Sequence, residues 1–399
     1  MNSRSKFVVV ISSTFLVLLL LLGTLLGKGT SPDSPYHHLA VYTEVLSRIK
    51  SEYVEEPDLK SVTLGALNGL LESIDPFASY LNSDQYKEYL KHHDEYKGDV
   101  GLVLSKRFGY IGIVAAVPGS PAAKAGLTTG DILETIKGVA TRDMPLAYAN
   151  LLLHGEPGTT IDITVLRRKP EPQKMTLTRA VPAPPPVSSK MMPNEVGYIR
   201  PDTLSAARVR EIAADLRDLE NKGAKRLVLD LRQCAVGQPE DGIALADLFL
   251  DKGLVTYLQG QKSPRKDFNA ESSKMVWNLP VVVLTNRGTA DGAEIAAAAL
   301  QDNHRAQVVG ERTYGDASLR RALTMDDGSA IILSVAKYYS PSGKAIQDSG
   351  VTPNEAVAEP EPQIESDEDG ETARPETPEP EQKGEDVILK RALEVLGKS

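Results

Sequence analysis

The chain has 399 residues, which is enough for about two to three domains of ordinary size. Its 45 Lys and Arg residues are outnumbered by 54 Asp and Glu residues, and 13 of these acidic residues lie in the segment 355–386. The rest of the chain is therefore close to neutral, which excludes a broad basic surface for nucleic acid. The single cysteine, Cys234, excludes an intramolecular disulfide and a cysteine-based zinc cluster. The six histidines have none of the spacings typical of a metal site, so we predict no metal and no other cofactor.

Residues 7–26 form an apolar stretch of 20 residues without a charged side chain. In a helix that rises about 1.5 Å per residue, this stretch spans about 30 Å, the thickness of the hydrocarbon core of a bilayer. Arg4 and Lys6 precede it, and basic residues favour the cytoplasmic side. A cleaved signal peptide normally has a shorter apolar region and a small-residue cleavage site, so it is the less favoured alternative. We therefore predict an uncleaved single-pass membrane anchor, with the body on the extracytoplasmic (periplasmic or extracellular) side.

The next part of the chain changes from helical to β-rich patterning. Apolar spacing predicts helices at 39–54, 62–71 and 83–92. Residues 98–168 consist of short β-branched runs between Gly and Pro turns, with one helical stretch at 145–153. A proline-rich segment follows, which we expect to hold an edge strand and then a stiff linker.

From residue 197 onward, strands alternate with helices. The sequences RLVLDLR and LPVVVLT are continuous apolar runs typical of buried strands, and a strand is also expected in AQVVG. Helices are predicted at 206–222, 242–250 and 292–303. This alternation predicts a largely parallel sheet that is covered on both faces. Residues 358–386 are Pro- and Glu-rich and are expected to be disordered, and residues 387–396 are expected to form a short amphipathic helix.

Five motifs follow one another in a fixed order: GALNGLLESIDPFASYL, the module at 98–168, RLVLDLR, AEIAAAALQDNHRAQVVGERTYG and YYSPSGKAIQ. In this order they resemble the bacterial carboxyl-terminal processing peptidases, also called tail-specific proteases, over residues 39–354. The resemblance implies an exported serine endopeptidase that recognises the C-terminus of a substrate through a PDZ module and cleaves with a serine–lysine dyad. Together with the apolar N-terminal stretch and the acidic C-terminal composition, the resemblance divides the chain into five expected parts. They are the cytoplasmic tip, anchor and linker at 1–35, a helical region at 36–97, the PDZ domain at 98–182, a mixed α/β peptidase core at 183–355, and an acidic disordered tail at 356–399.

The module at 98–168 also carries the segment SPAAKAGLTTGDILETIKG, which is similar to PDZ sequences. The resemblance implies that a backbone loop binds the terminal carboxylate of a peptide, which then adds as an extra strand. Glycine at the first position of this loop lets the backbone approach the ligand closely. The alternative is a small β domain without a ligand. The implied loop residues are Gly101, Leu102, Val103 and Leu104.

The positions that carry catalysis in the family are substituted. The nucleophilic serine aligns with Asp291 in TADGAE, and the general-base lysine aligns with Asp316 in TYGDASLR. The glutamine that orients the lysine aligns with Arg320. An Asn-Pro-Gly-Gly-like loop, whose backbone N–H helps to hold the oxyanion, is replaced by QCAVG, which puts Val236 before Gly237. Loss of one oxyanion donor costs about 2.7–4 kcal/mol, and valine disfavours the positive φ that glycine adopts freely.

A serine–lysine dyad works because a neutral lysine accepts the proton of the serine, and two carboxylates cannot repeat this chemistry by the same route. We expect Asp291 to pair with Arg320 in a filled, inert site. Two alternatives remain at Asp291 and Asp316: an aspartic pair that shares one proton, and a cation site, for which two carboxylates are too few. Other nucleophiles near the site are Thr289, Ser318 and Cys234.

These substitutions favour a catalytically inactive pseudopeptidase that binds the C-terminal tails of exported or membrane proteins and acts as a scaffold or regulator. One alternative is an active serine-type endopeptidase that processes C-termini with a non-standard site. Another is a structural subunit, in a homodimer or in a hetero-oligomer with an active relative. The membrane is a partner through the N-terminal helix.

Overall fold

The computed structural model describes residues 35–92, 97–142, 144–167, 171–359 and 386–398. The chain divides into two compact units, Met1–Ala66 and Leu67–Ser399. The predicted anchor at 7–26 and residues 360–385 of the predicted tail lie outside the described residues. No helix in the described ranges has both the length and the apolar character that a membrane crossing requires.

The described part of the N-terminal unit contains helix α2 (Pro35–Glu52) and the first turns of α3 (Leu59–Glu72). Both predicted helices exist, and both begin earlier than the apolar spacing indicated. On α2 the side chains of Leu39, Val41 and Val45 are each at least 50% exposed. This helix therefore presents apolar side chains to solvent.

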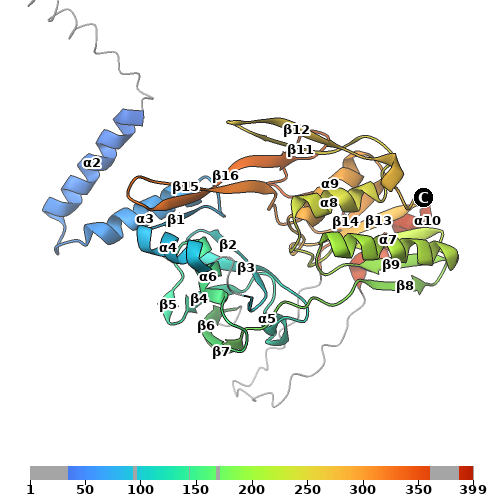
Figure 1. Ribbon diagram of the computed structural model, residues 1–399, viewed down its shortest axis with the longest axis horizontal. Coiled ribbons are helices and arrows are strands. Elements are labelled where there is room, and N and C mark those ends of the chain that lie inside the picture. The colour runs from blue at the N-terminus through green and yellow to red at the C-terminus, as the bar shows by residue number, and fades with distance from the viewer. Residues whose placement is uncertain (1–34, 93–96, 143, 168–170, 360–385, 399) are drawn as a thin grey trace, which may run out of the picture. The chain divides into compact units, whose positions relative to one another are not determined.

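The second unit begins with the last turns of α3 and contains the PDZ module (Figure 1). The sheet of this module has the strand order β2-β3-β4-β6-β7, so β2 lies at an edge. Apolar side chains that alternate along the strands, such as Leu104, Ile111 and Ile163, fill its core. Its strands are β2 (Leu102–Arg107), β3 (Tyr110–Ala116), β4 (Ile132–Ile136), β5 (Val139–Ala140), β6 (Thr160–Leu166) and β7 (Gln173–Thr178), and its helices are α5 (Pro121–Lys124) and α6 (Leu146–Leu153).

The core of the molecule is a six-stranded sheet with the order β17-β14-β13-β10-β9-β8. All neighbouring strands are parallel except β8, which pairs antiparallel with β9 at the edge. The largely parallel sheet was predicted, whereas β8, which follows the predicted proline-rich linker, was not predicted as a strand. The strands are β8 (Ser188–Met192), β9 (Val196–Arg200), β10 (Arg226–Asp230), β13 (Val281–Thr285), β14 (Ala306–Gly310) and β17 (Glu355–Ala356).

Helices cover both faces of this sheet, as predicted. On one face, Leu227 and Leu229 of β10 pack with apolar residues of α7 (Ala206–Asn221), α8 (Pro239–Asp247) and α9 (Gly292–Asp302). On the other face, Val228 packs with the apolar side of the C-terminal helix α10 (Val387–Lys398). Because neighbouring residues of a strand point to opposite faces, both layers can be filled by one apolar run.

A second, antiparallel sheet was not predicted. It has the order β1-β16-β11-β12, with β15 also paired to β16. The alternating segment SAIILSVAKYY forms its long central strand, to which one hairpin, the strand that precedes it in the sequence and a short N-terminal strand are added. Its strands are β1 (Ser79–Leu81), β11 (Leu254–Gly260), β12 (Ser263–Asn269), β15 (Ser318–Thr324) and β16 (Ala330–Tyr339), and helix α4 (Ser83–His92) follows β1.

Helix α8 begins at Pro239, three residues before the predicted start at 242. A capping box explains the earlier start: the backbone N–H of Gln238 donates to the carboxylate of Asp241 at 3.0 Å, and proline occupies the first turn. The N-terminus of α8 is therefore well defined beside the loop that carries Val236 and Gly237.

Candidate active site and peptide-binding module

The nucleophile position of the family lies on a strained turn between β13 and α9. Asp291 is the N-cap of α9 and has φ 53° and ψ −127°. A non-glycine residue in such a conformation costs about 1–3 kcal/mol and persists only where the surroundings hold it. The N–H of Ala290 donates to the carbonyl of Cys234 at 3.1 Å, which ties the turn to the loop after β10. Sharp strained turns of this kind expose the nucleophile in α/β hydrolases.

Close helix packing fixes the same turn from the other side. A Cβ on Gly242 of α8 would lie 2.0 Å from the carbonyl oxygen of Gly292, and a Cβ on Gly292 would lie 2.5 Å from the carbonyl oxygen of Gln238. Only glycine at both positions lets the starts of α8 and α9 approach this closely. The backbone at residue 291 is therefore held in place by α8.

Glu294, in the first turn of α9, holds the segment that carries Asp316. Its carboxylate is fully buried. It accepts hydrogen bonds from the backbone N–H groups of Gly315 and Asp316, each at 2.7 Å, and from the hydroxyl of Thr313. Burial raises the pKa of Glu294 to about 8. The sequence motifs did not single out this residue, although it ends the TADGAE segment that located Asp291.

At the base position, Arg320 forms an ion pair with Asp316. Our expectation that Asp291 pairs with Arg320 was therefore wrong. The ladder between β15 and β16 shifts register between Leu319 and Arg320, and such bulges re-aim the side chains beside them. The guanidinium of Arg320 also lies 4.2 Å from the ring centroid of Phe77.

The carboxyl group of Asp291 makes no hydrogen bond and no ion pair with any residue that the structure describes. Burial, and next the negative charge of Asp316, raise the pKa of Asp291 well above its ordinary value. Burial also raises the pKa of Asp316, against the lowering effect of Arg320. The carboxyl groups of Asp291, Glu294 and Asp316 thus lie close together, and Asp316 is the one of the three that forms an ion pair with Arg320, which favours at least one bound proton in the cluster.

The backbone of the oxyanion loop differs from our expectation. Neither Val236 nor Gly237 has a positive φ, whereas Gln233 does, at 61°. The carbonyl of Val236 accepts from the N–H of Leu204 at 2.7 Å. The N–H groups of Val236 and Gly237 have no acceptor within the described ranges. Valine at residue 236 is therefore unstrained, and the loop retains unengaged N–H groups.

The three alternative nucleophiles are held in structural roles. Cys234 is fully buried, and burial raises the pKa of its thiol. The hydroxyl of Thr289 is buried and donates to the carbonyl of Leu231 at 2.8 Å. The hydroxyl of Ser318 lies 2.8 Å from that of Ser334. Within the described ranges, no three His, Cys, Asp or Glu side chains converge in a way that could hold a metal ion.

The residues to which the resemblance assigns peptide binding are Gly101 and the first three residues of strand β2, Leu102, Val103 and Leu104, so most of the expected loop is strand. Gly101 has φ 80°, and a Cβ there would lie 2.2 Å from Cβ of Ser120. Leu102 and Leu104 are buried in the core of the module, and Val103 is half-buried. The following strand β2 is an edge strand, which leaves one side for a ligand strand over its first residues.

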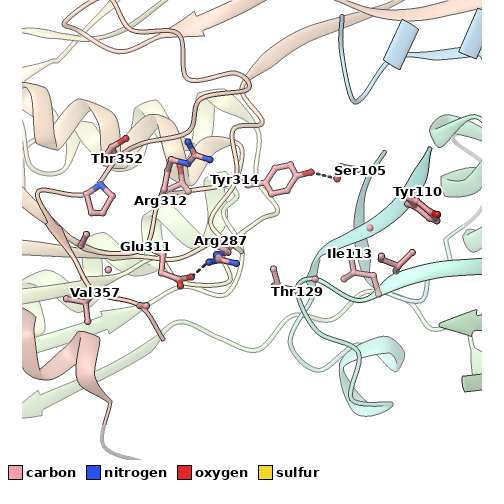
Figure 2. Close-up of a pocket in the computed structure, with 18 of the residues that line it drawn as sticks. Ser105, Tyr110, Ile113, Thr129, Arg287, Glu311, Arg312, Tyr314, Thr352 and Val357 are labelled. Carbon is pink, nitrogen blue, oxygen red and sulfur yellow. Dashed lines mark hydrogen bonds and ion pairs between the residues drawn. The ribbon is translucent and has the colours of Figure 1, made fainter. Parts of the chain in front are cut away.

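The PDZ module packs directly against the two loops of the candidate site. Val114 and Ala115 of β3 form an apolar cluster with Ala235 and Ala290, the neighbours of residues 236 and 291. Polar contacts flank this cluster: the hydroxyl of Tyr314 bonds that of Ser105, and the hydroxyl of Thr129 lies 2.9 Å from Oε1 of Gln233. Figure 2 shows Tyr314 pointing from the core toward Ser105 of the module. The site and the module therefore share one interface.

Comparisons with known proteins agree with this architecture. The profile of peptidase family S41 matches residues 195–357, and a PDZ-domain profile matches residues 112–167. A carboxyl-terminal-processing protease of Synechocystis sp. is 34% identical over 78% of this chain and 75% of the relative. The carboxy-terminal processing protease CtpA of Bacillus subtilis is 32% identical over 83% of this chain and 71% of the relative. The solved structure of a photosystem II D1 C-terminal processing protease superposes with a TM-score of 0.66 at 25% identity, and covers 82% of this chain and 88% of that one.

Proposed function

The chain belongs to the carboxyl-terminal processing proteases of peptidase family S41, and from this premise we propose that it is a pseudopeptidase, which binds polypeptide C-termini without cleaving them. The observation that carries the proposal is the chemistry at the two dyad positions. Asp291 offers a carboxyl group where the family has a nucleophilic hydroxyl. Asp316 offers a carboxylate, paired with Arg320, where the family has a neutral amine. A serine–lysine dyad works by transfer of a proton from the serine hydroxyl to the neutral lysine amine, and two aspartates in these positions cannot reproduce that transfer.

Ligand binding is assigned to the PDZ module. The loop at Gly101 has the positive φ that brings backbone N–H groups close to a carboxylate, and β2 has a free edge beside it. Partners of this module are the C-terminal tails of exported or membrane proteins. Because β3 packs on the candidate site, a bound tail lies near residues that no longer cleave it.

The location and assembly of the protein follow from its N-terminal part. The apolar residues 7–26 serve as a single-pass anchor that leaves the body on the extracytoplasmic side. On α2, Leu39, Val41 and Val45 are at least half exposed, which supports a contact with a second copy or with an active relative.

One observation favours a second candidate function, an endopeptidase that uses an acidic pair. Burial raises the pKa of both Asp291 and Asp316, and the negative charge of Asp316 raises that of Asp291 further, as in two carboxyl groups that share a proton around one water. Such an enzyme would be most active under acidic conditions, where the pair of aspartates retains one shared proton. The ion pair between Asp316 and Arg320 opposes this function, because it fixes one carboxylate away from a shared water.

One experiment separates the two functions. The full chain in detergent is incubated with unfolded polypeptides that carry apolar C-termini at pH 4.5 and at pH 7, and products are sought by mass spectrometry. We expect no cleavage at either pH, and we expect binding that is lost when the terminal carboxylate is amidated. Cleavage that Asp291→Asn abolishes would establish the second function and refute the pseudopeptidase. The control Glu220→Gln, an exposed position on α7, should change neither result.

A further inference from the structure

A cavity of about 930 Å³ lies between the PDZ module and the core. In Figure 2, Tyr110 and Ile113 of the module face Arg287, Arg312 and Val357 of the core across this space. Solvent-exposed aromatic rings line the side that the module contributes: Phe108 is 91% exposed and Tyr110 is 45% exposed. Large exposed aromatic side chains beside a cavity are typical of a surface that binds another chain segment.

The charged groups of this cavity favour an anionic ligand. Arg312 is exposed, and its guanidinium has no partner among the residues that the structure describes. Arg287 reaches Glu311 only at 3.6 Å, and its side chain is 77% exposed. The charged side chains that line the cavity, two arginines and one glutamate, therefore carry a net positive charge. Arginine suits this task because its planar group binds carboxylates and also stacks on aromatic rings.

The path of the chain brings an acidic segment to the same place. Val357 and Ala358 line the cavity, and the carboxylate of the next residue, Glu359, accepts from Nδ2 of Asn286 at 2.9 Å. The chain is described again from Asp386, whose carboxylate accepts from the guanidinium of Arg232 at 3.0 and 2.8 Å.

Asn286 directly follows β13 and Arg232 lies two residues after β10, and these two strands are parallel neighbours. Their carboxyl ends are about 4.8 Å apart, so the chain leaves and returns at one edge of the sheet. The intervening residues 360–385 contain ten acidic and two basic residues.

We propose that the acidic segment 360–385 is an intramolecular ligand of the cavity, bound through Arg287, Arg312 and the exposed rings of Phe108 and Tyr110. A tether that begins at the wall of the cavity gives the segment a high effective concentration there, so weak ion pairs suffice. An acidic client polypeptide would have to compete with it. The proposal is independent of whether the protein cleaves peptides.

Disulfide trapping in the full chain tests the proposal. Cysteines replace Ser366 in the segment and Thr352, an exposed residue that lines the cavity, while the natural Cys234 is buried and inert to the oxidant. We expect Arg287→Glu/Arg312→Glu to slow trapping at least fivefold, and 0.5 M NaCl to do the same, because exposed ion pairs are screened by salt. The matched control Arg210→Glu/Arg217→Glu changes charge equally on α7, away from the cavity, and should trap at the original rate.

Three results would overturn the proposal. Trapping at equal rates in both charge-reversed proteins would mean that Arg287 and Arg312 do not bind the segment. Trapping unaffected by salt would exclude an electrostatic ligand. Disulfides that form only between two chains, seen by mixing proteins with one new cysteine each, would assign the cavity to the segment of a second copy. Circular dichroism of each variant confirms that the fold is retained.

Discussion

The buried carboxyl group of Glu294 predicts an unusual dependence of stability on pH. Its pKa is raised from 4.5 to about 8 by burial, so the folded protein keeps a proton that the unfolded chain releases. A group whose folded pKa is raised stabilises the fold below the unfolded pKa, and this stability is lost as pH rises through the folded pKa. At about 1.36 kcal/mol per pH unit, the shift makes the free energy of unfolding about 3 kcal/mol lower at pH 8 than at pH 5.5. Asp291 and Asp316 act in the same direction, because their pKa values are also raised.

Urea denaturation at pH 5.5 and pH 8 measures this difference. The variant Glu294→Gln cannot titrate, so the difference should shrink by about 3 kcal/mol, while the exposed control Glu220→Gln should keep the difference of the natural chain. At pH 5.5 the variant should be less stable by about 1–3 kcal/mol, because its side-chain amide accepts fewer of the three hydrogen bonds. Stability that is equal at both pH values, or higher at pH 8, would refute the reasoning. It would show that the three hydrogen bonds outweigh burial and keep Glu294 ionised.

Three further predictions concern the site, the module and the C-terminal helix. The variant Asp291→Ser/Asp316→Lys/Arg320→Gln should gain cleavage of C-terminal peptides at least tenfold above the natural chain, because the strained turn and the unengaged N–H groups are already in place. Mass spectrometry of peptide products checks this, and no product would mean that the loop cannot hold the oxyanion. Gly101→Ala should lower stability by more than about 1 kcal/mol and weaken peptide binding, since φ is positive and the new Cβ meets a side chain at 2.2 Å. Thermal denaturation and fluorescence anisotropy with a labelled peptide measure the two effects, and an unchanged melting temperature would contradict the strain. Arg232→Met should cost about 3–5 kcal/mol in urea denaturation, because it leaves the buried carboxylate of Asp230 without its guanidinium partner. A cost below about 1 kcal/mol would show that this carboxylate finds another partner.

The pattern of residues along the chain was sufficient to predict most local structure. Continuous apolar runs identified β10, β13 and β14, and the helical spacing identified α7 and α9, because burial imposes these periods on any sequence. The motif order located Asp291 and Asp316 at the dyad positions, and the structure brings both into one carboxyl cluster. The strands of the second sheet were mostly missed, since hairpins such as β11–β12 are half exposed and lack a long apolar run.

The identity of the residues at the catalytic positions was a property of the sequence alone, whereas their partners were decided by the tertiary structure. Arg320 bonds Asp316 instead of Asp291 because a register shift in β15 turns its side chain, and no local pattern records such a shift. Glu294 clamps residues more than twenty positions away, which only the docking of α9 beside that segment makes possible. The order of residues determines which groups are present and how often apolar side chains recur; the contacts between distant charges depend on strand register and packing, which form only when the whole chain folds.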